Sequence, residues 1–250
     1  MTSFVLKIIA LISMTCDHVG DSLVHTTSFL NVIGRIAFPI FAFQISEGYQ
    51  HTRDLKKYFI RLGTFALISQ IPFMLFLSTY TPDYYKLNIF FTLLLGLAAI
   101  ALFDWCHRRA DRVVRPYSGQ AQNPPLHNNV IRSILYTALG IICVIAMMGI
   151  SYVTKCDYSW YGVAIIFLFY FFKETPLWMN VSFIAVTVIR YMQYYSASPS
   201  MWYVYMFMGV CSSLILINLY NGKKGKSMKY FLYVFYPAHL LLLYLITLWT

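Results

Sequence analysis

The sequence predicts an all-α fold: a polytopic bundle of about nine transmembrane helices that forms one membrane domain over residues 1–250. Composition is the first reason, because 59% of the residues are hydrophobic and only 11% are charged. A soluble domain carries about 45–50% apolar and about 25% charged residues. The second reason is the content of 21 Tyr and 20 Phe residues, since aromatic side chains are enriched at membrane–water boundaries. The third is that basic residues gather in short loops between apolar segments, which is typical of multi-pass membrane proteins.

Each predicted helix is an apolar segment close to the ~20 residues that a bilayer-spanning helix needs. In chain order the segments are 3–20, 28–48, 57–79, 87–106, 130–151, 158–173, 177–196, 201–220 and 229–248. The sixth and seventh are separated only by a short break at 173–176. These two segments can therefore form either two spans or a re-entrant pair.

The basic loops predict how the bundle is oriented. They follow the second, fourth and eighth segments, and they include Lys56 and Lys57, Arg108 and Arg109, and Lys223, Lys224 and Lys226. With nine spans these loops share one side, and because basic loops normally face the cytoplasm, we expect a cytoplasmic N-terminus and an outer C-terminus. The net charge of +10 does not indicate nucleic acid as a partner, since we find no surface stripe that interleaves aromatic with basic residues.

The one long polar segment, 107–129, is predicted to be a flexible cytoplasmic linker, because it is rich in Arg and then in Ser, Gly, Gln, Asn and Pro. It divides a four-helix N-terminal part, 1–106, from a five-helix C-terminal part, 130–250. No convincing internal repeat occurs, which weakens the case for an inverted-repeat transporter. The five cysteines form no CxxC pair and no HExxH spacing is present, so we expect neither a disulfide scaffold nor a metal site.

Asp17 and His18, near the end of the first helix, and Arg35, early in the second, are the leading candidates for a catalytic site. Ionisable groups inside a membrane bundle are costly and usually mark function. At a rise of about 1.5 Å per residue, Arg35 lies at a depth similar to that of Asp17 on the consecutive helix, so we expect an ion pair that orients His18. A neutral histidine can act as a general base or as a nucleophile that carries an acyl group. The alternative is a structural clamp between two helices.

Four further residues with polar or charged side chains lie in or near apolar segments. His239 follows Pro237 in the last helix, where a proline can kink the helix toward a cavity. Arg190 lies in the outer third of the seventh segment, where it can hold an anion or an acidic side chain. Lys7 and Glu47 are most simply a structural or snorkelling pair.

Several motifs along the chain carry a family resemblance when they are taken together. They are Asp17-His18, Ile33-Gly-Arg-Ile-Ala-Phe-Pro-Ile-Phe-Ala-Phe, Glu47-Gly48, His51-Thr-Arg53, Tyr58-Phe-Ile-Arg-Leu, Ala66-Leu-Ile-Ser-Gln-Ile-Pro-Phe73, Leu87-Asn-Ile-Phe-Phe-Thr-Leu-Leu-Leu-Gly and Tyr236-Pro-Ala-His-Leu-Leu-Leu-Leu. With these motifs the chain resembles the TraX family of integral membrane acetyltransferases. The resemblance covers the first 100 residues well, the last 20 clearly and the middle only as apolar helices.

The resemblance implies an enzyme of the bacterial inner membrane that moves an acetyl group from cytoplasmic acetyl-CoA to an amine or hydroxyl at the outer side. The acceptor is a small molecule, a glycan or a pilin-like peptide, and the best-known family activity is acetylation of the N-terminus of conjugative pilin. The implied catalytic residues are His18, Asp17 and Arg35. We expect His239, Arg53, Arg61 and Lys57 at the acetyl-CoA, Arg190 and Asn88 at the acceptor, and no metal.

This reading predicts a tunnel through the membrane that is open to acetyl-CoA below and to the acceptor above. The basic residues expected at the phosphates of acetyl-CoA have an equally ordinary explanation, because they also enforce topology. Two other functions fit the sequence. One is a proton-coupled permease in which Asp17, His18 and Arg190 relay protons or bind the substrate. The other is a non-catalytic factor for the assembly of pilin or another membrane protein.

Overall fold

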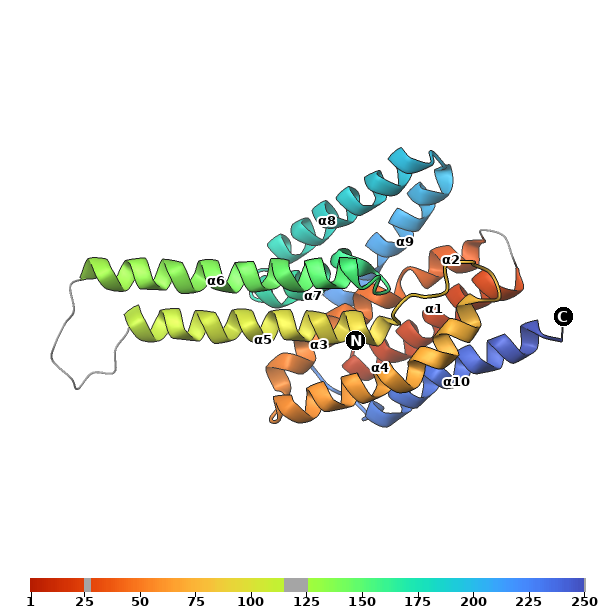
Figure 1. The fold of residues 1–250 in the computed structure, drawn as a ribbon, viewed down its shortest axis with the longest axis horizontal. Coiled ribbons are helices and arrows are strands. Elements are labelled where there is room, and N and C mark those ends of the chain that lie inside the picture. The colour runs from red at the N-terminus through yellow and green to blue at the C-terminus, as the bar shows by residue number, and fades with distance from the viewer. Residues whose placement is uncertain (25–27, 115–125, 250) are drawn as a thin grey trace.

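The computed structural model describes residues 1–24, 28–114 and 126–249, and it confirms the all-α fold (Figure 1). The helices are α1 (Ser3–Leu23), α2 (Phe29–Gly34), α3 (Ala37–His51), α4 (Leu55–Leu77), α5 (Ile89–Val114), α6 (Leu126–Val153), α7 (Ser159–Phe171), α8 (Pro176–Ala197), α9 (Met201–Asn218) and α10 (Lys229–Thr247). Within the described residues, seven spans are long and apolar enough to cross a membrane: α1, α2 together with α3, α4, α5, α6, α9 and α10. The count of nine spans and their orientation remain predictions.

The second predicted segment is not one continuous helix, because it breaks at Arg35 and Ile36 into α2 and α3. Pro39 explains the break. A proline has no N–H, so it cannot donate the bond that the carbonyl of Arg35 would accept in a continuous α-helix. Arg35 consequently becomes the C-cap of α2, and its side chain starts from this break between the two helices, here called the corner.

The predicted linker at 107–129 is shorter than expected, because α5 continues to Val114 and α6 begins at Leu126. Ion pairs one helical turn apart extend α5, and such i,i+4 pairs stabilise a helix. They join Arg108 to Asp104, and His107 to Asp111 when the histidine is protonated. Only 115–125 remains of the linker, and this part lies outside the described residues. The two long helices lie side by side and project beyond the rest of the bundle (Figure 1).

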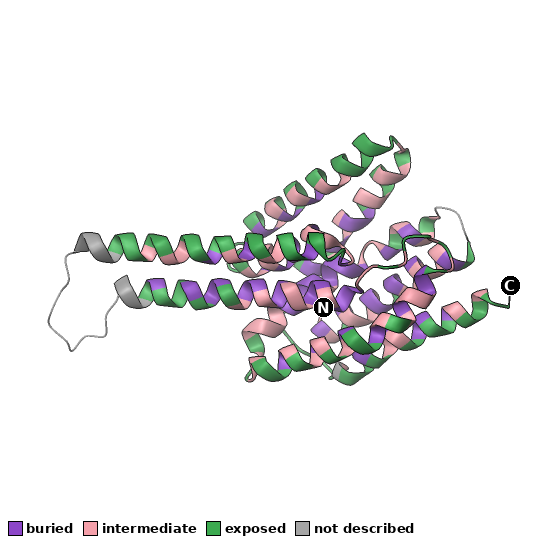
Figure 2. Ribbon diagram, in the orientation of Figure 1, coloured by how far each residue is buried: buried purple, intermediate pink, exposed green. Residues whose placement is uncertain are grey.

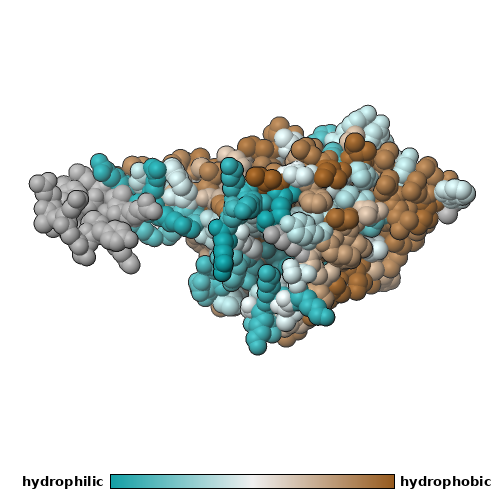
Figure 3. All heavy atoms as spheres, turned by 90° about the horizontal axis from the view of Figure 1, so that it is seen from below, coloured by the Kyte–Doolittle hydropathy of each residue, from teal (hydrophilic) through white to brown (hydrophobic). Residues whose placement is uncertain are grey.

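Polar and apolar surfaces separate along the long axis of the molecule. The loop between α3 and α4 and the loop between α9 and α10 lie toward the end at which α5 and α6 project (Figure 1). Hydrophilic side chains gather toward that end, and hydrophobic ones cover most of the remaining surface in view (Figure 3). The predicted topology requires this arrangement, with its basic loops on one side of a bilayer.

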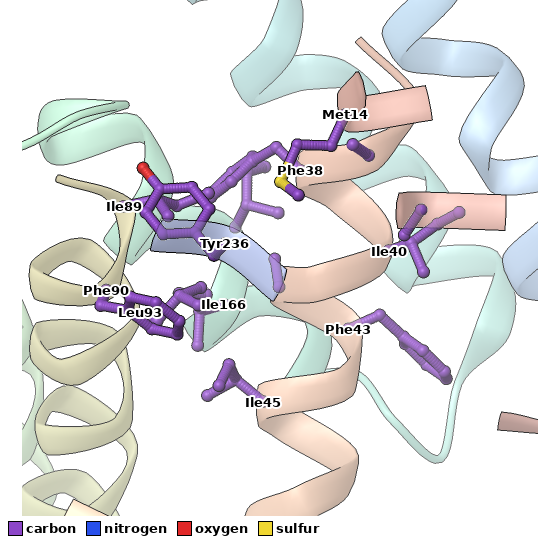
Figure 4. Packing of buried hydrophobic residues seen from close by; sticks show 14 of the residues in the cluster. Met14, Phe38, Ile40, Phe43, Ile45, Ile89, Phe90, Leu93, Ile166 and Tyr236 are labelled. Atoms are coloured by element: carbon purple, nitrogen blue, oxygen red, sulfur yellow. The ribbon is translucent and has the colours of Figure 1, made fainter. Parts of the chain in front are cut away.

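The core lies among α1, α3, α4, α5, α7 and α10, whose inward faces are buried (Figure 2). Phe38, Ile40 and Leu97 are almost completely enclosed, and Figure 4 shows Phe38 and Ile40 in this packing with Tyr236 of α10. By contrast, only 11% of the apolar window of α6 is buried, so most of this helix presents apolar side chains of the kind that contact lipid. Helices distant in sequence therefore meet around α1, where the candidate site is found.

Candidate functional site

The predicted ion pair between the first two spans is present. Arg35 Nη2 donates to Asp17 Oδ1 at 2.7 Å. The amide of Asn31 donates to Asp17 Oδ1 at 3.3 Å and to Asp21 Oδ1 at 2.7 Å, so one buried amide links two carboxylates. The Asp17 and Arg35 side chains are only 12% and 23% exposed. Because burial removes water from both groups, their mutual attraction and these hydrogen bonds have to replace hydration.

Gly34 allows α1 and α2 to approach closely enough for this contact. A Cβ atom at this position would lie 2.3 Å from the Cβ of Asp17, far inside van der Waals contact. Gly34 also immediately precedes Arg35, so the residue that permits the close approach adjoins the one that forms the ion pair. Packing thus explains the glycine of this Gly-Arg sequence, and the ion pair explains the arginine.

His18 contacts His239 of α10 instead of Asp17. His18 Nδ1 lies 2.8 Å from His239 Nε2, and the two rings stack with centroids 5.0 Å apart. The expectation that the ion pair orients His18 through hydrogen bonds is therefore wrong. Neighbouring residues on a helix point about 100° apart because a turn takes 3.6 residues, so Asp17 faces α2 while His18 faces α10.

The hydrogen bonds of His239 fix the protonation of both neutral rings. His239 Nδ1 lies 2.8 Å from the carbonyl oxygen of Phe235. A carbonyl only accepts, so Nδ1 of His239 carries the proton and Nε2 of His239 accepts from His18 Nδ1–H. His18 Nε2 is then left with a free lone pair. This is the form in which a histidine acts as a base or a nucleophile.

His18 lines a cavity of about 760 Å³, here called the His18 cavity. Asp17, Asp21 and Arg35 line the same cavity, together with Arg190 and several tyrosines, among them Tyr158, Tyr191 and Tyr194. Asp157, between α6 and α7, also lines it, and burial raises the pKa of this carboxyl to about 6 although the positive charge of Arg35 opposes the rise. The cavity offers charged groups of both signs and several hydroxyls to a polar molecule.

A second cavity of about 410 Å³, here called the basic cavity, adjoins the first. Lys7, Arg61, Lys224 and Lys226 contribute cationic side chains to it, and apolar side chains of α1, α4, α5 and α10 line much of the rest. Two buried donors in its lining, Gln44 Nε2 and Arg61 Nε, have no hydrogen-bond partner among the described residues. Unpaired buried donors are costly, so this cavity suits a ligand rich in oxygen acceptors.

The structure brings some of the predicted ligand-binding residues to the cavities and excludes others. Arg190 lines the His18 cavity, with its guanidinium 4.5 Å from the centroid of the Tyr194 ring. Arg61 lines the basic cavity. His239 is buried behind His18 and lines neither cavity. Asn88 is fully buried and donates to the carbonyl of Ala66 at 2.7 Å, which is a structural role.

The two other basic residues expected at acetyl-CoA lie outside both cavities. Arg53 is exposed, and neither it nor Lys57 lines a cavity. Lys57 is paired at 3.2 Å with Asp54, the N-cap of α4. Sequence reasoning passed over Gln44 and assigned Lys7 to a structural or snorkelling pair with Glu47. Gln44, Lys7 and Glu47 all line the basic cavity. For these residues, the one feature of the sequence that could have indicated a functional role is the position of Lys7 within an apolar helix.

The fold and these contacts define a multi-pass membrane protein in which a histidine pair and an ion pair lie beside two adjoining internal cavities. The family model for TraX protein matches residues 3–247, and the chain belongs to the TraX family. The chain is also similar to a probable fimbrial assembly protein, FimC of serogroup H1, from Dichelobacter nodosus. Their identity is 27% over 260 residues, which cover 97% of this chain and 94% of the relative. No solved structure matches the chain.

The ion pair predicts a specific pattern of stability. Asp17→Asn leaves Arg35 without its counter-charge, and we expect the protein to lose about 3 kcal/mol, the lower end for a buried pair because both groups line a cavity. The double variant Asp17→Asn/Arg35→Gln should recover part of that loss. Unfolding of purified protein in detergent measures both, with the exposed Lys57→Gln as a control that changes little. Equal stability of Asp17→Asn and the wild type would contradict a structural role for the pair.

Proposed function

We propose that this protein is a membrane acyltransferase that moves an acetyl group from acetyl-CoA in the basic cavity to an amine or hydroxyl in the His18 cavity. The observation that carries the proposal is His18, whose free Nε2 is fixed by His239 in a cavity that adjoins a basic one. The similarity to a probable fimbrial assembly protein supports a role in the assembly of a fimbria or pilus, with a pilin-related acceptor.

The positions of the protons on His18 and His239 allow two courses for the reaction. With an amine acceptor, His18 Nε2 takes a proton from the nitrogen as this attacks the thioester carbonyl. The C–N bond forms, the C–S bond breaks, and the proton leaves on the thiol of coenzyme A. The imidazolium formed in between is stabilised by the Nδ1–H bond from His18 to His239. Alternatively, Nε2 attacks the carbonyl itself, and the acetyl group rests on His18 before it moves to the acceptor.

The basic cavity fits acetyl-CoA by the chemistry of its lining. Coenzyme A carries phosphates, which bind Lys and Arg side chains, and the cavity offers Lys7, Arg61, Lys224 and Lys226. The amide carbonyls of coenzyme A would accept hydrogen bonds from donors such as Gln44 Nε2, which lacks a partner among the described residues. Apolar residues deeper in the cavity, such as Leu11 and Leu93, suit the methylene groups of the pantetheine arm.

A second candidate is a non-catalytic assembly factor that holds a small membrane protein in place. The printed name of the relative from Dichelobacter nodosus favours it, because that name states assembly and no chemistry. Such a factor needs the bundle but has no use for a free lone pair on His18. The two functions therefore differ in how the protein depends on this one nitrogen.

His18→Ala separates these functions. We expect the variant to fold and to bind acetyl-CoA, but to lose transfer of labelled acetyl to membrane material by about 10²-fold or more, as is typical when a general base is removed. His107→Ala is the matched control, because His107 lies on α5 and lines neither cavity. Retained transfer in His18→Ala would refute the role of this residue. Normal fimbrial assembly without transfer would favour the assembly factor.

The tautomer argument predicts a difference between two variants of His239. His239→Gln keeps a side-chain carbonyl that can accept the His18 Nδ1–H, whereas His239→Leu has no acceptor. We expect the glutamine variant to keep more activity, with the leucine variant lower in kcat while KM for acetyl-CoA is little changed in both. The rates of labelled acetyl transfer give this comparison. If the two variants are equally impaired, His239 acts through packing alone.

Substitutions of Arg61 and Lys57 test where acetyl-CoA binds. Arg61→Gln removes a cation from the basic cavity, and we expect the Kd for acetyl-CoA to rise about tenfold, the effect of roughly 1.4 kcal/mol. Lys57→Gln removes the same charge from a residue that lines neither cavity, so its Kd should match that of the wild type. Calorimetric titration of each purified variant measures the two constants. The reverse order would favour binding at the exposed first turn of α4.

A further inference from the structure

Four large side chains line both cavities and are here called the wall: Met14 of α1, Phe41 of α3, Ile89 of α5 and Tyr236 of α10. Met14, Ile89 and Tyr236 are buried, and Figure 4 shows these three within the same part of the core. Each of the four comes from a different helix. A group that moves from one cavity to the other therefore passes side chains from four helices.

His18 lies directly beyond this wall. Its ring centroid is 6.5 Å from that of Tyr236, and His239 is 5.7 Å from Tyr236. His18 lines only the His18 cavity, whereas Gln44 and Arg61 line only the basic cavity. An acyl group on a carrier held by Gln44 and Arg61 must therefore cross the wall to reach His18 Nε2.

The members of the wall differ in how freely they can move. The ring of Tyr236 is buried and packs on that of Phe90, with the ring centroids 5.1 Å apart. Ile89 is β-branched and so has little freedom at χ1. Met14 is unbranched with three rotatable bonds. Rotation of Met14 is thus the simplest way to open the wall without moving the backbone.

We propose that this wall, with Met14 as its movable member, selects the acyl group by size: acetyl passes to His18, and longer acyl chains are held back. The space released by one thioether side chain is of the order of a short acyl group, and each further methylene has to fit between the stiff side chains of Ile89 and Tyr236. A single methylene in such a site changes kcat/KM by about 10- to 200-fold. This inference rests on the acyl transfer proposed above.

The test compares acetyl-CoA with propionyl-CoA as donors for the purified full-length protein, with an extract of piliated bacterial membranes as the acceptor. We expect the wild type to prefer acetyl-CoA by about tenfold or more in kcat/KM, and Met14→Ala to raise the propionyl-to-acetyl ratio by about tenfold. Leu97→Ala is the matched control, because Leu97 of α5 is buried but lines neither cavity. Its ratio should stay at the wild-type value.

Ile89→Ala enlarges the same wall from α5, and it replaces Met14→Ala if that variant does not fold. A raised ratio in either wall variant but not in Leu97→Ala supports the filter. If the wild type transfers acetyl and the ratio is the same in all variants, or rises equally in Leu97→Ala, the filter is overturned while acyl transfer stands. If the wild type transfers neither group, the proposed function fails and the filter fails with it.

Discussion

The ion pair between Asp17 and Arg35 is the constraint on which the site depends. Two charges inside an apolar bundle are tolerated only as partners, so α1 and the corner between α2 and α3 are held together at this depth. Gly34 removes the side chain that would separate them, and Pro39 creates the corner from which Arg35 reaches across. With Asp17 turned toward α2, the next residue of α1 faces α10.

That rotation gives His18 a neutral partner in place of a charged one. His239 Nε2 accepts a hydrogen bond from His18 Nδ1–H, and its own Nδ1–H donates to the carbonyl of Phe235. A carboxylate in this position would introduce a further buried charge next to Arg35 and Asp17, at the cost of more desolvation. The neutral ring of His239 holds His18 in its Nδ1–H tautomer without that cost. Pro237 lies two residues before His239 inside α10.

Sequence alone predicts the ion pair but not the histidine pair. Asp17 and Arg35 are isolated charges at one depth on consecutive helices, so their positions in the sequence are enough to predict that they pair. His18 and His239 are 221 residues apart, and their contact depends on α10 packing against α1, which no local pattern encodes. For the same reason Lys57 is predicted at a ligand and found paired with Asp54. The position of a basic residue near a loop indicates membrane topology, whereas the direction in which its side chain points depends on how the helices pack.

The wall relates the two cavities to the proposed transfer. A continuous polar channel would admit water, which competes as an acceptor and weakens electrostatic contacts. A thick apolar barrier would keep a donor in the basic cavity from reaching His18. Four side chains from four helices line both cavities, so under the proposed acyl transfer the rotation of one of them would suffice to open the path. Tyr236 belongs to this wall and lies beside His18, with ring centroids 6.5 Å apart, so this residue links the wall to the proposed base.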